Sequence, residues 1–213
     1  MHIEDIVTFW RGQQEVDDQG QWGHRLDRKV LDAGPHTFNL DYPVSPYVGH
    51  VLTAPVIILG ANAKYDPAIT PSEFSDEAAI KAYVARIDDP SHADWSFVSR
   101  YYDDTNYGHL IGPGKVVVVN ACTYRSPRLS QEKENQRMIP RLPSSIFIRR
   151  WLLDAVFPLA KQGDRLIINN RGQHWRLGPA ATATGVVRDP CPASPLITSN
   201  AFSAMNDFLA NRP

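Results

Sequence analysis

The 213-residue sequence predicts an α/β fold, a three-layer α/β/α sandwich around a short and mainly parallel central sheet. Three observations lead to this prediction. Short β-branched runs recur along the chain, helical patterns separate them, and each run stops at a polar or glycine residue. Strands that alternate with helices pair in parallel, because each helix returns the chain to the end of the sheet where it started.

Residues 1–50 are predicted to form an irregular cap. Apolar residues at positions 3, 6, 7 and 10 follow helical spacing and favour a short amphipathic helix, after which the chain is polar and contains three prolines. The composition shows no linker between this cap and the rest. We therefore expect one domain over 1–213, with its core in 51–213.

Four strands and three further helices are expected in the core. Continuous apolar runs are typical of strands buried on both faces, and such runs mark candidate strands at 55–59, 116–119 and 165–168, the last of which begins with Arg165. A weaker fourth candidate, Thr-Gly-Val-Val, covers 184–187. Helical patterns cover 73–87, 144–161 and 199–211. Ser144 or Ser145 is the expected N-cap of the second of these helices, and Gly163 follows its end.

The composition excludes several classes of protein. The formal net charge is −1, which argues against tight, non-specific binding of nucleic acid along phosphates. The two cysteines lie in no metal-binding cluster, and no glycine-rich nucleotide motif occurs, so we expect neither a metal nor a cofactor. The sequence shows no secretory signal and no run of membrane-spanning length, which favours a cytoplasmic protein. The oligomeric state stays open.

Candidate site residues follow the predicted strands, since ligands of open parallel sheets bind beyond the carboxyl ends of the strands. Asn62, Asn120 and Asn169 each stand at or shortly after such an end. An asparagine amide offers both a donor and an acceptor, which suits recognition of the edge of a base. The alternative is that each asparagine only forms a turn.

Four short motifs in this order resemble the uracil-DNA glycosylase superfamily. They are Gly60-Ala61-Asn62-Ala63-Lys64-Tyr65, the run 116–119 with Asn120, Gly172-Gln173-His174, and Ser194-Pro195-Leu196 followed by a helix. Asn62 falls on the family's catalytic position. In this respect the sequence resembles the branches of the family that carry asparagine at that position. The resemblance covers roughly residues 50–210.

The resemblance implies hydrolysis of the N-glycosidic bond of uracil or a related damaged or mismatched base, with DNA as a candidate partner. Asn62 would orient the attacking water and Asn120 would bind the base edge. Gly60, Ala61, Tyr65, Ser194 and Leu196 would also contact substrate. Tyr65, Tyr101, Tyr102 and Tyr107 are candidates for stacking on the base. His174 is either a general acid or oxyanion donor, or a structural residue.

Departures from the family pattern keep other functions open. Pro192 stands where the uracil-specific branch has its catalytic histidine, Ala63 stands where most members have proline, and no acidic residue matches the catalytic aspartate. The uracil-specific mechanism therefore does not carry over. One alternative is a divergent member that binds a nucleobase, nucleotide or protein without catalysis. Another is a small-molecule hydrolase that uses His174.

Seven arginines flank the candidate site in the sequence. They would either hold phosphates or belong to a solvated surface with local ion pairs. They are Arg125, Arg128, Arg141, Arg149, Arg150, Arg171 and Arg176.

Overall fold

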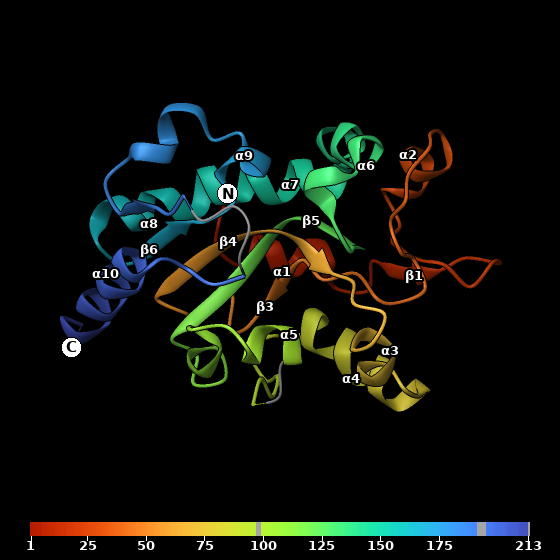
Figure 1. Ribbon diagram of the computed structural model, residues 1–213, viewed down its shortest axis with the longest axis horizontal. Coiled ribbons are helices and arrows are strands. Elements are labelled where there is room, and N and C mark those ends of the chain that lie inside the picture. The colour runs from red at the N-terminus through yellow and green to blue at the C-terminus, as the bar shows by residue number, and fades with distance from the viewer. Residues whose placement is uncertain (97–98, 191–194, 213) are drawn as a thin grey trace.

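The computed structural model describes residues 1–96, 99–190 and 195–212. Its centre is a five-stranded sheet of order β3-β5-β4-β6-β7, flanked by helices (Figure 1). Four neighbouring strands run parallel, and the edge strand β3 runs antiparallel to β5. The strands are β3 (Tyr47–Val48), β4 (Val56–Lys64), β5 (Val116–Ser126), β6 (Leu166–Asn169) and β7 (Val186–Arg188). The prediction of an α/β fold with a mainly parallel sheet is confirmed, and the arrangement is consistent with three layers.

The four predicted strands are present, but two of them are longer than their apolar runs. β4 continues past Gly60 to Lys64, and β5 continues past Asn120 to Ser126. Backbone pairing between these two strands persists through Asn62, opposite Cys122. Asn62 and Asn120 were expected at or shortly after strand ends, but they lie inside β4 and β5, because ladder hydrogen bonds form between the backbones of polar residues as well as apolar ones.

Strands in the first 50 residues were not expected. β1 (Gln14–Val16) and β2 (Trp22–His24) form an antiparallel pair, and β3 joins the edge of the main sheet. The predicted N-terminal helix appears as α1 (Asp5–Trp10), whose Ile6 and Trp10 are fully buried. The segment predicted as a cap thus contributes both to the core and to the sheet.

Helices lie on both sides of the sheet. In Figure 1, α6, α7, α8 and α9 lie on one side, and α3, α4 and α5 lie on the other. The remaining α-helices are α2 (Arg28–Asp32), α3 (Thr70–Glu73), α4 (Glu77–Asp88), α5 (Arg100–Asp103), α6 (Lys133–Met138), α7 (Pro143–Trp151), α8 (Phe157–Gln162), α9 (Gly172–Trp175) and α10 (Ser199–Ala210). Short turns of other helix types are η1 (Gly108–Leu110), η2 (Leu129–Gln131), η3 (Ile139–Arg141), η4 (Leu152–Val156) and η5 (Gly178–Thr182).

The predicted helix over 144–161 is interrupted. η4 is a π-helical turn between α7 and α8, and Pro158 stands at the start of α8. A proline ring cannot fit a regular helix interior, so a wider turn before it relieves the clash. Gly163 ends the segment in a left-handed conformation with φ 84°, as the sequence predicts.

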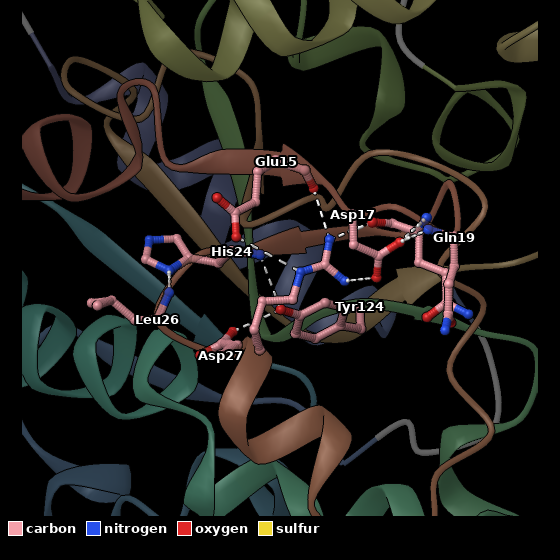
Figure 2. A network of polar contacts seen from close by, with 9 residues as sticks. Glu15, Asp17, Gln19, His24, Leu26, Asp27 and Tyr124 are labelled. Atoms are coloured by element: carbon pink, nitrogen blue, oxygen red, sulfur yellow. Dashed lines mark hydrogen bonds and ion pairs between the residues drawn. The ribbon is translucent and has the colours of Figure 1, made fainter.

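The cap of α7 comes from a distant residue. Ser144 and Ser145, the expected caps, lie inside the helix. Asp27 instead accepts a hydrogen bond from the Ser144 amide at 2.9 Å and a second bond from the Ser144 hydroxyl. The Tyr124 hydroxyl of β5 donates to the same carboxylate at 2.9 Å and accepts from the His24 amide at 3.1 Å (Figure 2). Asp27 therefore ties the N-terminal region to both β5 and α7.

The same network fixes the β1–β2 pair. Arg28 donates to Asp17 at 2.9 Å, and its Nε lies 3.9 Å from a Glu15 carboxylate oxygen. Among the described residues, no helix is long and apolar enough to cross a bilayer.

Candidate functional site

A cavity of about 150 Å³ lies at the carboxyl ends of β4, β5 and β6, and we call it the strand-end cavity. β4 is the central strand of the three, and the chain leaves it for β5 on one side before it returns to β6 on the other. This change of direction is where open α/β sheets bind ligands. The lining comprises residues 58–62 and Lys64, Val118, Asn120, residues 127–130, Tyr101, Tyr102, Tyr107, Asn170, Arg171, Gln173, His174 and Pro195.

Strand pairing brings the two asparagines to one face of the sheet. Gly60 pairs with Asn120, and Asn62 pairs with Cys122. Paired residues of neighbouring strands point to the same face, and so do residues two apart along one strand. Asn62 and Asn120 therefore share a face, although 58 positions separate them in the sequence. Cys122 is fully buried, and burial raises the pKa of its thiol, so it does not supply a nucleophile.

The side chain of Asn62 is fixed by two backbone carbonyls. Its Nδ2 donates to the Ala63 oxygen at 2.7 Å and to the Ser126 oxygen of β5 at 3.1 Å. Both partners are acceptors, so the amide nitrogen must face them. The half-buried side chain then has its Oδ1 as the remaining acceptor beside the cavity.

Asn120 forms part of the floor of the strand-end cavity. The residue is 1% exposed, and its Nδ2 donates to the Ser45 oxygen at 2.9 Å. This bond uses one of the two amide hydrogens. Its Oδ1 packs so closely on Gly60 that a Cβ atom there would overlap it. Glycine at position 60 is thus required by the close approach of β4 to Asn120.

Three of the four candidate tyrosines line the strand-end cavity. Tyr101, Tyr102 and Tyr107 line the cavity, whereas Tyr65 lies outside the lining and stacks on Tyr42 with 6.3 Å between ring centroids. Burial raises the pKa of Tyr102 and of Tyr107, so both keep their hydroxyl protons at neutral pH. The predicted substrate contacts Gly60 and Ala61 line the cavity, and Tyr65 does not.

His174 lies in the short helix α9 beside the cavity. Burial lowers the pKa of its imidazole, and the positive charge of Arg171 lowers it further. Its Nε2 lies 3.2 Å from the Nε2 of Gln173, an amide nitrogen that only donates. The neutral imidazole therefore accepts through Nε2 and carries its proton on Nδ1. Trp175 holds α9 against the sheet by donating to the Gly60 oxygen at 2.8 Å.

Two polar pairs hold the segment around residue 197 beside the cavity. Asn106 donates to the Ile197 oxygen at 2.9 Å and accepts from the Ile197 amide at 3.2 Å. Asn170 donates to the buried carboxylate of Asp189 at 2.8 Å and to the Leu196 oxygen at 3.2 Å. Leu196, a predicted substrate contact, is 40% exposed and is not among the residues that line the cavity.

Three residues singled out in the sequence are not assigned to the site. Ser194, a predicted substrate contact, and Pro192 lie outside the described residues. Asn169 is 5% exposed, and Gly172 lies so close that an added Cβ would be 2.8 Å from its Oδ1. The carboxyl end of β6 therefore contributes Asn170 rather than Asn169 to the lining.

The charged side chains of the cavity lining are all cationic. Lys64, Arg128 and Arg171 line it, and none of its described lining residues is Asp or Glu. Arg125 does not belong to this group, because it is 6% exposed, donates to the Lys64 oxygen at 3.1 Å and packs over the Phe74 ring. The cavity therefore favours an anionic or electron-rich ligand although the whole chain is nearly neutral.

Sequence reasoning missed some of the lining. The segment 127–130 follows the unpredicted extension of β5, and only Arg128 of this segment was singled out in the sequence, as one of the flanking arginines. Within the described residues, no group of three or more His, Cys, Asp or Glu side chains is placed to hold a metal.

Comparison with known proteins found no matching family model, no similar curated protein and no similar solved structure.

Proposed function

We propose that this chain is a hydrolase of the DNA glycosylase type with the fold of the uracil-DNA glycosylase superfamily. One observation carries the proposal. Asn62, Asn120, His174 and three tyrosines surround one small cavity at the switch point of a parallel sheet, and every charged residue of its described lining is cationic. These are groups that suit a flat polar base attached to a phosphate backbone.

The size of the cavity supports a single ring as ligand. An engineered cavity of about 150 Å³ in another protein holds benzene, and the strand-end cavity has the same volume. A pyrimidine base has a ring of that size. Tyr101, Tyr102 and Tyr107 supply aromatic surface for it, and the Oδ1 atom of Asn120 supplies an acceptor for its edge.

The reaction needs a water positioned at the sugar. In hydrolysis the water oxygen bonds to C1′, the C1′–N bond breaks with its electron pair passing to the base, and a water proton ends on the base. Asn62 Oδ1 would accept a hydrogen bond from that water, and its fixed amide would hold the direction of attack. Asparagine cannot take the proton, so the rate would depend on positioning and on stabilisation of the departing base.

His174 would stabilise negative charge on the departing base. A neutral imidazole with its proton on Nδ1 is a hydrogen-bond donor, and the low pKa keeps it neutral at physiological pH. Lys64, Arg128 and Arg171 would add positive potential around the same charge, or hold the neighbouring phosphates.

The test is release of a free base. Single-stranded, paired and mismatched oligonucleotides with uracil, hypoxanthine, xanthine or thymine at one position are incubated with the protein, and abasic sites are detected by alkaline cleavage. We expect cleavage of at least one substrate and about a hundredfold slower cleavage by Asn62→Ala, as for a misplaced reacting group. Asn211→Ala, at the exposed end of α10, is the matched control. The proposal fails if no substrate is cut, or if both variants cut equally well.

A second function is favoured by one observation. None of the described residues that line the strand-end cavity is a carboxylate, so His174 is the one described lining residue of a type that commonly serves as general base. The same cavity would then bind a nucleobase or nucleotide without hydrolysis. The test is the melting temperature in the presence of uracil, UMP or dUMP. A rise in melting temperature, for a protein that releases no base, would support this second function. A small-molecule hydrolase would instead lose activity in His174→Ala with substrates unrelated to DNA.

A further inference from the structure

A second and larger cavity, of about 470 Å³, lies between β5, η3, α7 and α9, and we call it the helix-side cavity. Ala121 lines it, whereas the preceding residue Asn120 lines the strand-end cavity. Successive residues of a strand point to opposite faces, so the two cavities use opposite faces of β5. They meet only around α9 and η2, where Gln173, His174 and Ser130 belong to both linings.

The walls of the helix-side cavity are mainly apolar. Ile139, Ile146, Leu153 and Trp175 contribute large apolar side chains to it. Its volume falls within the roughly 300–1,000 Å³ typical of small-molecule sites. Ile146 lies in α7, on the side of the sheet where α9 also lies in Figure 1, and remains 51% exposed. A large exposed apolar side chain beside an apolar cavity is what a ligand of this kind would cover.

The charged residues of this lining are three arginines. Arg149 and Arg150 come from α7, and Arg176 follows α9. Arg149 donates to the Arg176 backbone oxygen at 2.6 Å, which ties α7 to the end of α9. Arg150 lies 3.3 Å from Asp154, but none of the described lining residues is itself Asp or Glu. The apolar cavity is therefore bordered by positive charge.

One buried polar group in this lining has no partner. Ser145 is 7% exposed, and its hydroxyl oxygen makes no hydrogen bond within the described part of the chain. Buried hydroxyl groups normally have a partner in the folded state. Because Ser145 lies in α7 and belongs to the cavity lining, rotation about its Cα–Cβ bond offers a donor to a bound ligand.

We propose that the helix-side cavity is a binding site for a small amphipathic anion, with a flat apolar body and one carboxylate. The apolar body would cover Ile146 and Leu153, and the carboxylate would lie near Arg149 and Arg176. This inference is independent of the function proposed for the strand-end cavity, since neither its residues nor its test requires hydrolysis.

The test measures binding of 2-naphthoate to the full chain by isothermal titration calorimetry, with 2-naphthamide as the uncharged ligand of the same shape. We expect saturable binding of one 2-naphthoate and roughly fivefold weaker binding of 2-naphthamide, as a partly solvated ion pair predicts. Ile146→Asp should weaken 2-naphthoate binding at least fivefold, because it places a negative charge at the apolar edge. Val16→Asp is the matched control, since Val16 is 47% exposed in β1 and lines neither cavity.

The outcomes separate this site from its alternatives. No saturable binding at millimolar 2-naphthoate overturns the proposal. Equal binding by Ile146→Asp and Val16→Asp also overturns it, because the ligand would then occupy another site. Inorganic phosphate or an eight-nucleotide thymidine strand that binds as tightly as 2-naphthoate and competes with it would overturn it too. The arginines would in that case form a phosphate-binding surface with no use for the apolar walls.

Discussion

Replacing Gly60 by alanine tests whether the close approach of β4 to Asn120 determines the shape of the strand-end cavity. A Cβ atom at position 60 would overlap Asn120 Oδ1 and lie 3.3 Å from Val118 Cγ1. Asn120 has little room to move, because it is 1% exposed and its Nδ2 donates to the Ser45 oxygen at 2.9 Å. The substitution must therefore either strain the packing or break that hydrogen bond.

The expected loss follows from these two routes. Overpacking an interior costs about 1–3 kcal/mol, and a buried carbonyl deprived of its donor costs about 1–3 kcal/mol. The routes are alternatives, so we expect the free energy of unfolding to fall by about 2 kcal/mol rather than by their sum. For a chain of about 200 residues this lowers the melting temperature by roughly 4–8 °C.

Urea unfolding followed by tryptophan fluorescence measures this loss. Gly34→Ala is the matched control, because a Cβ there would lie 3.5 Å from Met138 Cε, an ordinary contact. That variant should stay within about 0.5 kcal/mol of the parent. The argument for Gly60 is refuted if the two alanine variants unfold at the same urea concentration.

Three further predictions concern hydrogen bonding and pH. Tyr124→Phe removes the hydroxyl group that donates to Asp27 and accepts from the His24 amide. Its free energy of unfolding in urea should fall by about 2 kcal/mol. A fall no larger than that of Tyr42→Phe would contradict this prediction. Burial lowers the pKa of His24. Below pH ~6.5 the His24 imidazole is therefore protonated more readily in the unfolded chain than in the folded chain. The free energy of unfolding should therefore fall between pH 7 and 5.5, by up to about 1.4 kcal/mol per pH unit. Burial raises the pKa of Asp27, so this carboxyl group contributes with the opposite sign. Constant stability over this range would contradict the prediction. Base release that uses neutral His174 should be flat from pH 6.5 to 8, and a decline as the pH rises through this range would exclude that role.

The order of the four parallel strands could be predicted because it depends on local composition. Each parallel strand carries its own apolar run, and α10 carries its own stripe and its Thr198 cap. The cap of α7 could not be predicted in this way. Asp27 reaches the Ser144 amide across 117 positions, and no local pattern marks a helix whose N-terminus is capped from so far away.

Part of the candidate site was also within reach of the sequence. The rule for open sheets led us to expect Asn62, Asn120 and His174 near the carboxyl ends of strands, and the structure brings them to one cavity. Both asparagines nevertheless lie inside the extended strands β4 and β5, and His174 lies in α9. The sequence could not predict which tyrosines line the cavity, since this depends on how the segment from Ser99 to Leu110 lies relative to β4. The partners of the Asn62 amide could not be predicted either, because they depend on the pairing of β4 with β5 beyond the apolar runs of both strands.

The N-terminal region does more than cover a finished core, because it holds β5 at several points. β3 pairs with β5 along the edge of the sheet, the Ser45 oxygen anchors the Asn120 side chain, and Asp27 anchors Tyr124. Without residues 1–50, β5 would present an open edge of unpaired backbone groups, which favours aggregation. Asn120 would also lose the bond that fixes its amide at the cavity floor. The four motifs beyond residue 50 therefore do not suffice to build the strand-end cavity, and its geometry depends on a segment in which no motif was found.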